Sequence, residues 1–239
     1  MLKKFLPVLV MSTVILICGM TSAQAANVLY WSDYDLGTNP FPTAMTQLGL
    51  TFDTASDISD FNTKLATGNY PLAVLFFQNY GYDASGSLST YLGNGGKVIF
   101  TDWTRDSAEG SLFDITYTSS TNQTPVTLTA DFLKNGIGDT LNLSNPGWGI
   151  WSMGMALNGA QSGATFPNGN VAVAYTSNTI INGMLSDTFA DSSEGLQFAK
   201  NELMFLTADP AVTPEPASLS LLGFGLIGLA GRRLRKTAK

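Results

Sequence analysis

Three short stretches of this 239-residue chain combine carboxylates, amides and aromatic rings, which are the side chains that bind sugars. Aromatic rings stack against the C–H faces of a sugar, while Asp, Asn and Gln hydrogen-bond its hydroxyl groups. Two carboxylates that face one bound sugar could also hydrolyse a glycosidic bond. We expect a ligand-binding rim formed by Trp31, Asp33, Asp35, Gln78, Asn79, Tyr80, Asp102 and Trp103.

Each of these signals has a plainer alternative. Loops at strand ends are polar in most proteins, and aromatic residues there often cap the core. The run Asp33 to Gly37 (DYDLG) alternates acids as a calcium loop does, but it lacks the later glutamate of an EF-hand and also reads as a solvated turn. Whether Asp33 and Asp102 form a catalytic pair stays open, because spacing in sequence does not fix their distance. Trp148 and Trp151 form either an exposed platform or one edge of the core. We expect no metal site and no cofactor.

Histidine is absent from the chain, and the single cysteine, Cys18, lies in the apolar N-terminal segment. Without histidine there is no Ser-His-Asp triad, no general base of the usual kind at neutral pH and no histidine-ligated zinc. Once the N-terminal segment is removed, no thiol nucleophile and no disulfide is possible. Any catalysis would have to rest on carboxylates or a bound cation.

The elements that must position the rim lie in the first half of the chain. Continuous apolar runs predict strands that are covered on both faces, as in a parallel sheet between two helix layers. In such a sheet ligands bind at the carboxyl ends of the strands, where the rim residues lie. We expect strands at 27–32, 50–54, 72–77 and 97–101, and helices at 42–48, 59–66 and from 85 or 87 to 92.

The second half is richer in Thr, Gly, Asn and aromatic residues, a composition typical of short β excursions and loops. A final helix is capped by Asp191 or Ser192 and carries an apolar stripe at spacings of three and four. The fold predicted is therefore an α/β three-layer sandwich with a mainly parallel sheet and later β excursions. Those excursions are expected at 115–119, 126–129, 141–143, 149–157 and 171–176, the last pairing with 178–184.

This layout resembles the class I glutamine amidotransferase-like group of flavodoxin-like folds. The likeness rests on Val28 to Trp31, Leu72 to Phe77 and Val171 to Tyr175, and above all on the passage Leu88 to Phe100 (LSTYLGNGGKVIF). In catalytic members the next turn bears a cysteine nucleophile. Here that turn reads Thr101-Asp102-Trp103, so the resemblance implies a relative without that catalysis or with different chemistry.

The N-terminus has the order of a secretory signal peptide. Lys3 and Lys4 precede an apolar run, and Ala23-Gln24-Ala25 offers small residues to a signal peptidase. We expect residues 1–25 to be removed. Lipoprotein processing at Cys18 is the alternative, but Ile17 stands where a small residue is normally needed.

The C-terminus carries a second targeting signal. The turn Pro214-Glu215-Pro216 is followed by an apolar run and then by basic residues that include Arg232, Arg233 and Arg235. The three parts in this order resemble the PEP-CTERM sorting tail of Gram-negative bacteria that make extracellular polysaccharide. That resemblance implies recognition by an exosortase, a membrane-embedded cysteine protease or transpeptidase; an ordinary membrane anchor is the alternative. We expect an ectodomain at 26–208, a Pro-rich linker at 209–216, a transmembrane helix at 217–231 that initially holds the protein in the inner membrane, and a basic cytoplasmic tail at 232–239.

Charge narrows the choice of partners. Of the 18 acids only Glu215 lies outside residues 26–213, and only five of the 12 Lys and Arg lie inside, so that region carries a net charge of −12. Nucleic acid is excluded as a partner because its phosphates would be repelled. The sequence predicts a non-enzymatic protein of the envelope or the extracellular polysaccharide matrix of a biofilm, with glycan as the candidate ligand. The alternative is a surface hydrolase that uses Asp33 and Asp102 or a divalent cation.

Overall fold

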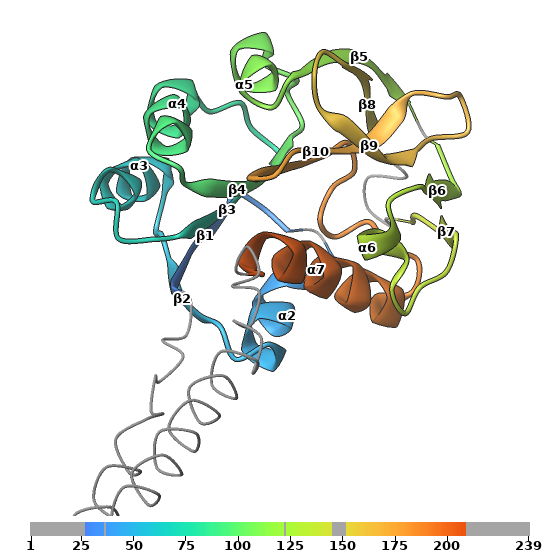
Figure 1. Cartoon of the computed structure of the whole chain (residues 1–239), viewed down its shortest axis with the longest axis horizontal. Coiled ribbons are helices and arrows are strands. Elements are labelled where there is room, and N and C mark those ends of the chain that lie inside the picture. The colour runs from blue at the N-terminus through green and yellow to red at the C-terminus, as the bar shows by residue number, and fades with distance from the viewer. Residues whose placement is uncertain (1–26, 36, 122, 145–151, 209–239) are drawn as a thin grey trace, which may run out of the picture.

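The apolar runs of the first half form one end of a sheet in a computed structural model of the chain, and the described residues contribute 11 strands to that sheet (Figure 1). The structure describes residues 27–35, 37–121, 123–144 and 152–208. Five strands run parallel in the order β2-β1-β3-β4-β11, which follows the doubly wound flavodoxin-like pattern. They are β1 (Asn27–Ser32), β2 (Thr51–Thr54), β3 (Leu72–Phe77), β4 (Lys97–Asp102) and β11 (Thr179–Asn182).

The remaining strands correct the predicted sheet. They do not leave a mainly parallel sheet as excursions but extend it in the antiparallel sense, so the sheet is mixed. The reason is the connections: β9, β10 and β11 follow one another through short turns, and such hairpins can only join antiparallel strands. The predicted pairing of the returning strand with the segment after it is confirmed. These strands are β5 (Ile115–Thr121), β6 (Val126–Leu128), β7 (Thr140–Leu141), β8 (Ser152–Leu157), β9 (Gln161–Thr165) and β10 (Val171–Tyr175).

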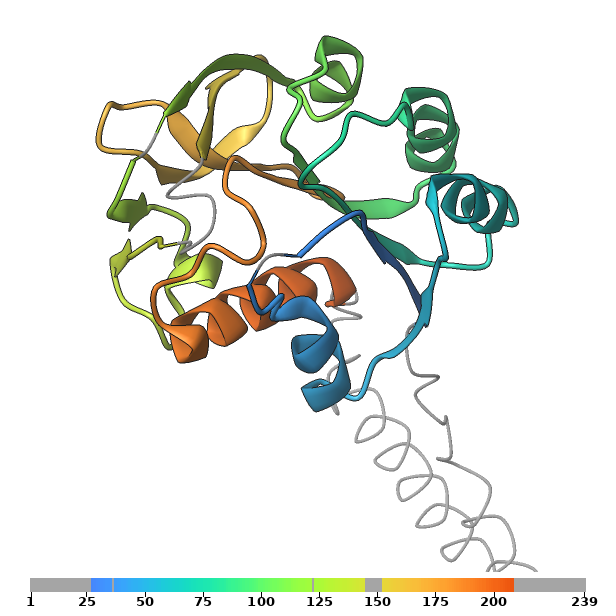
Figure 2. The ribbon, with the colours of Figure 1, turned by 180° about the vertical axis from the view of Figure 1, so that it is seen from behind.

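Helices cover both faces of the parallel half, as predicted (Figures 1 and 2). On one face lie α3 (Ile58–Ala66), α4 (Ser85–Gly93) and α5 (Ser107–Leu112), over a core that contains Leu75 and Phe100. On the other lie α2 (Phe41–Gln47) and α7 (Ser192–Thr207), and α6 (Asp131–Lys134) lies beside α7 and β6 at the antiparallel end of the sheet. Helices α5 and α6 and strand β9 were not predicted, because they are short and lack an apolar period.

Helix α7 confirms its prediction and adds a buried acid. The Asp191 side chain caps it by accepting hydrogen bonds from the backbone N–H groups of Ser193 (2.7 Å) and Glu194 (3.3 Å). Glu202 of α7 is completely buried, and one of its oxygens accepts a hydrogen bond from Asn182 Nδ2 at 3.0 Å. Burial raises the pKa of this carboxyl to about 8. The single hydrogen bond from Asn182 lowers the pKa, but by less than burial raises it.

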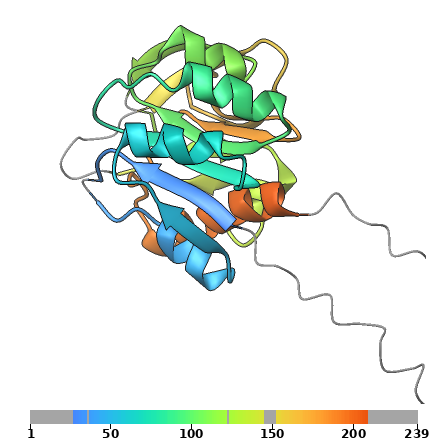
Figure 3. The same cartoon turned by 90° about the vertical axis from the view of Figure 1, so that its left-hand side faces the viewer.

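Parallel strands give the sheet two unlike edges. We call the edge where β1, β3, β4 and β11 end the carboxyl edge, and the one where they begin the amino edge. β1 begins at the amino edge and α7 ends there (Figure 3), where Lys97 Nζ donates to the Leu206 carbonyl at 2.6 Å. Chain segments before and after the domain therefore join it at the amino edge.

Several predicted parts fall outside the described residues. They are the signal peptide (1–25), the linker (209–216), the membrane helix (217–231), the basic tail (232–239) and the pair Trp148 and Trp151. Among the described residues, no helix has the length and apolar character needed to span a membrane.

Candidate functional site

Asp33 holds the loop that follows β3. Its Oδ1 accepts a hydrogen bond from the backbone N–H of Gln78 at 2.6 Å. Its Oδ2 accepts two more, from the N–H groups of Asn79 (3.0 Å) and Tyr80 (2.8 Å). Three backbone donors pointing at one carboxylate fix this turn, so Asp33 positions the loop that carries Tyr80.

Gln78 is buried and ties three loops of the carboxyl edge together. Its Nε2 donates to the carbonyl of Tyr34 (2.8 Å) and to Asp35 Oδ1 (2.5 Å), both in the loop after β1. Its Oε1 accepts hydrogen bonds from the backbone N–H (2.6 Å) and hydroxyl (2.9 Å) of Ser186, which follows β11. The amide is fully used inside the protein, so it contributes rigidity to the edge.

Asp35 and Asp187 bring negative charge to the same part of the edge. Asp35 Oδ1 also accepts a hydrogen bond from Asn39 Nδ2 at 3.1 Å, and Asp187 Oδ2 accepts one from the Gly37 N–H at 2.8 Å. Burial is the main cause that raises the pKa of the Asp35 carboxyl, and the charge of Asp187 adds to it. The hydrogen bonds to Asp35 act in the opposite direction.

Asp102 is completely buried at the end of β4 and closes the next turn. Its Oδ1 accepts from the N–H (2.8 Å) and hydroxyl (2.6 Å) of Thr104, and its Oδ2 from the Asp106 N–H (2.6 Å). Within this turn Arg105 has a positive φ of 63°, a conformation that needs such support in a residue other than glycine. Asp102 therefore anchors the turn that follows β4.

Asp33 and Asp102 lie on opposite sides of β3. Strand β1 pairs with one edge of β3 and β4 with the other, which puts the two backbones about 10 Å apart. Asp33 already receives three hydrogen bonds from the loop after β3, and Asp102 receives three from its own turn. The structure thus brings the two acids to one edge but directs both toward neighbouring backbone.

The aromatic residues of the edge divide into buried and exposed ones. Trp31 is buried, with its ring packed edge-on against Phe77 and Tyr82 at centroid distances of 6.1 and 5.1 Å. Tyr82 also contacts Tyr80, at 6.5 Å. Tyr80 is 63% exposed and Tyr34 is 45% exposed, whereas Trp103 and Asn79 are half-buried. Two phenol rings therefore face solvent above a firmly held edge.

A cavity of about 580 Å³ opens at the same edge, between the starts of α2 and α7. Its size lies in the range that takes small ligands. Hydroxyl groups and apolar side chains make up most of its wall, and among the described lining residues only Asp187 is charged. The lining residues are Gly37, Thr38, Pro40, Thr43, Ser144, Asp187, Phe189, Ala190, Ser192, Ser193, Gly195 and Leu196.

Sequence reasoning missed the contribution of the loop after β11 and of α5. Ser186 and Asp187 follow the segment 178–184, which was expected to be a strand. Polar residues directly after a strand could have indicated that they belong to the carboxyl edge. Glu109 of α5 is buried, and its Oε1 accepts from the Ala84 N–H at 2.9 Å, which ties α5 to the start of α4. Burial raises the pKa of Glu109, helped by the charges of Asp106 and Asp102.

Within the part of the chain that the structure describes, no three His, Cys, Asp or Glu side chains gather in a way that could hold a metal ion. The acids of the carboxyl edge are instead spread among separate turns. Their hydrogen bonds go to backbone and side-chain donors nearby.

Comparison with known families identifies the C-terminal sorting signal. Residues 212–236 match the family described as the PEP-CTERM protein-sorting motif, as the sequence predicted. The motif implies an exported, cell-envelope-associated protein that is processed by an exosortase. No curated protein sequence matches the chain.

Solved structures share the fold at low identity. A β-galactosidase from the psychrophilic Marinomonas ef1 gives a TM-score of 0.50 at 14% identity; the match covers 77% of this chain but only 29% of the β-galactosidase. A glutamine amidotransferase from Thermotoga maritima gives 0.49 at 12%, covering 83% of this chain and 94% of that one. Another from Methylobacillus flagellatus gives 0.45 at 10%, covering 80% and 81%. Amidotransferase-like folds are thus among the structural neighbours, as predicted.

Proposed function

We propose that the exported domain binds neutral polysaccharide at its carboxyl edge and does not turn it over. The observation that carries the proposal is the exposure of Tyr34 (45%) and Tyr80 (63%) on two loops joined by the Gln78 and Asp33 hydrogen bonds. Large exposed rings on a rigid base are suited to stacking against sugar faces at low entropic cost. The cavity between the starts of α2 and α7, at the same carboxyl edge, would add hydrogen bonds from its hydroxyl-bearing residues.

The carboxylates support binding without hydrolysis. A glycosidase needs one acid to give a proton to the leaving group and another to act as base or nucleophile. Asp33 and Asp102 each receive three hydrogen bonds from the adjacent loops, and Asp102 is completely buried. We therefore assign both acids to the construction of the edge.

The charge of the domain favours a neutral polymer. Residues 26–213 carry a net charge of −12, which would repel acidic polysaccharides at low ionic strength. The rim expected from the sequence keeps Tyr80, Asn79 and Trp103 as contact residues in this proposal. Trp31, Gln78, Asp33 and Asp102 support them from beneath.

Attachment agrees with this arrangement. The sorting motif follows α7, and α7 ends at the amino edge, so the carboxyl edge lies at the far side of the domain from the point of attachment. In our proposal a signal peptidase removes residues 1–25, and residues 217–231 hold the protein in the inner membrane until an exosortase processes the tail. The carboxyl edge is then open to the matrix before and after processing.

Affinity electrophoresis tests the proposal. The full-length chain, in a detergent without a sugar headgroup, would run through gels with dextran, galactomannan or laminarin, and through gels with alginate as the acidic polymer. We expect retardation by at least one neutral polymer and about fivefold weaker retardation for Tyr80→Ala, since one aromatic stack contributes about 1 kcal/mol. Leu157→Ala, which removes a 39% exposed side chain on distant β8, is the matched control and should behave as the parent.

No retardation by any neutral polymer would overturn the proposal. So would equal retardation of the parent and Tyr80→Ala, or a release of reducing ends from the retained polymer.

A further inference from the structure

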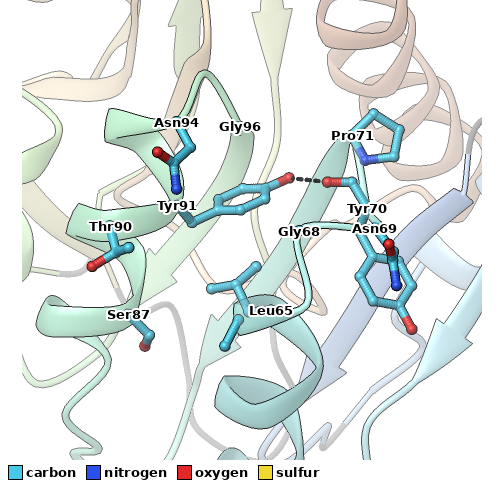
Figure 4. A pocket seen from close by; sticks show the side chains of 11 residues that line it. Leu65, Gly68, Asn69, Tyr70, Pro71, Ser87, Thr90, Tyr91, Asn94 and Gly96 are labelled. Carbon is cyan, nitrogen blue, oxygen red and sulfur yellow. Dashed lines mark hydrogen bonds between the residues drawn. The ribbon is translucent and has the colours of Figure 1, made fainter.

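A second cavity lies at the amino edge, on the face covered by α3 and α4. It encloses about 420 Å³ between the last turns of these helices and the starts of β3 and β4. Figure 4 shows its walls: Tyr70 and Asn69 stand on one side, and Ser87, Thr90, Tyr91 and Asn94 on the other. None of these residues belongs to the carboxyl edge.

The residues that line the cavity are uncharged in a domain that is strongly acidic. Among the described residues that line it, none is Asp, Glu, Lys or Arg. Both phenols stay neutral at physiological pH: the hydrogen bond to Asp53 raises the pKa of Tyr70 to about 12, and burial raises that of Tyr91 to about 12. Within the described residues, the side-chain amides of Asn69 and Asn94 make no hydrogen bond, which leaves four donor hydrogens and two acceptor oxygens for a ligand.

The walls are held in place by contacts within the protein. The Tyr91 hydroxyl donates to the Tyr70 carbonyl at 2.8 Å, drawn as the dashed line in Figure 4. The Tyr70 hydroxyl donates to Asp53 Oδ2 at 2.5 Å, which fixes the second ring. Gly96 lies directly against the Tyr91 ring, since a Cβ there would come within 2.4 Å of it. A preformed cavity spares a ligand the cost of ordering these side chains.

We propose that this cavity binds a single uncharged sugar unit, such as the end of a neutral polysaccharide chain. Aromatic rings, amides and hydroxyls without charge match the C–H faces and hydroxyl groups of a pyranose, and offer nothing to balance a carboxylate or phosphate. The Tyr70 ring supplies the stacking surface, Asn69 and Asn94 bind ring hydroxyls, and Thr90 accepts from one. Because the residues differ from those of the carboxyl edge, either site can fail without the other.

Two sites at opposite edges of one sheet would let the domain join two polysaccharide chains. Neither site alone would join two chains. Two sites also raise the avidity of the domain for the matrix, because the second contact is effectively intramolecular once the first has formed. Weak binding at each site is then enough for retention in the matrix.

Titration with small glycosides tests the proposal. Methyl glycosides of glucose, galactose, mannose and N-acetylglucosamine, and glucuronate as the charged probe, would be titrated into the full-length chain by ligand-observed NMR, again without a sugar-headed detergent. We expect one neutral glycoside to bind with a Kd of roughly 1 mM, the weak range for a small ligand with few contacts. Asn94→Trp, which fills the cavity from an exposed position, should weaken it at least about tenfold.

Two further variants keep the result clear. Thr63→Trp puts the same bulk on exposed α3 outside the cavity and should bind as the parent. Asn69→Ala removes an amide without adding bulk and should weaken binding even if Asn94→Trp fails to fold. The proposal is overturned if no neutral glycoside binds or if glucuronate binds best. It is also overturned if Asn69→Ala leaves glycoside binding unchanged while Tyr80→Ala abolishes it, because the glycoside would then bind at the carboxyl edge.

Discussion

The two edges of the sheet are built with opposite chemistry. At the carboxyl edge Asp33, Asp102 and Asp187 close the turns, and aromatic rings project beyond them. At the amino edge the described residues that line the cavity beside Tyr91 carry no charge, and a glycine and a phenol hydrogen bond hold its shape. At the carboxyl edge the acids bind loop backbone, whereas uncharged groups line the cavity at the amino edge.

What decides the role of an acid is the number of donors that reach it. Asp102 and Glu202 are both completely buried, but Asp102 receives three hydrogen bonds and Glu202 one. A buried carboxyl group with a single donor is better protonated, which agrees with the raised pKa of Glu202, whereas the three donors of Asp102 tie it to its turn. The comparison predicts different responses to substitution and to pH.

Removing the Asp102 carboxylate should have the largest effect. Asp102→Ala leaves the Thr104 and Asp106 donors unpaired beside a buried strand end, so we expect a loss of about 3 to 5 kcal/mol in the free energy of unfolding. Urea unfolding followed by tryptophan fluorescence measures it. Asp139 forms an ion pair with Lys134 and its side chain is 80% exposed, so Asp139→Ala should lower the free energy of unfolding by less than about 1 kcal/mol. Equal losses in the two variants would show that Asp102 does not hold its turn.

Glu202→Gln should change the dependence of stability on pH. The ordinary pKa of 4.5 applies in the unfolded chain and about 8 in the folded one, so between these values folding takes up a proton. Stability of the parent should therefore fall as pH rises across this window, by up to about 1.4 kcal/mol per pH unit from this group. Glu202→Gln lacks that contribution. Its free energy of unfolding relative to that of the parent should therefore rise by about 3 kcal/mol between about pH 5 and about pH 7.

Urea unfolding at several pH values measures this slope. Glu194→Gln, in the first turn of the same helix, is the control and should keep the slope of the parent. If Glu202→Gln and Glu194→Gln run parallel to the parent across the window, Glu202 is charged in the fold and the comparison with Asp102 fails.

The amino edge should respond to a single methyl group. In Gly96→Ala the new Cβ would overlap the Tyr91 ring, which must move, so we expect a loss of about 1 to 2 kcal/mol and weaker binding in the cavity. Gly86→Ala is the control within α4, because nothing lies within 4 Å of its Cβ and alanine favours a helix. Calorimetric unfolding should show a higher midpoint for Gly86→Ala and a lower one for Gly96→Ala; the same shift in both would contradict the packing described.

The sequence predicted the elements whose pattern is continuous. Runs such as Leu72 to Phe77 and the capped stripe of α7 need no partner to be recognised, and parallel strands bring their ends to one edge. It could not predict which side of a turn a carboxylate faces, so it left open whether Asp33 and Asp102 form a catalytic pair. Helix α5 and strand β9 were missed because Ser, Gly and Gln dominate them and tertiary pairing decides their structure.

The cavity at the amino edge was also invisible in the sequence. Tyr70, Tyr91 and Gly96 come from three different elements, and each is an ordinary core or turn residue by itself. Only their juxtaposition makes a neutral pocket. Likewise, Glu202 lies next to the apolar stripe of α7, and its burial follows from how deeply that helix packs.

Titration of the double variant Tyr34→Ala/Tyr80→Ala tests the central claim most directly. The neutral polysaccharide that retards the full-length chain would be titrated by calorimetry into the parent, the double variant and Leu157→Ala. We predict that the double variant binds at least about tenfold more weakly while Leu157→Ala binds as the parent does. Unchanged affinity of the double variant, with the fold intact by circular dichroism, would contradict the claim that exposed rings on an acid-built edge recognise the ligand.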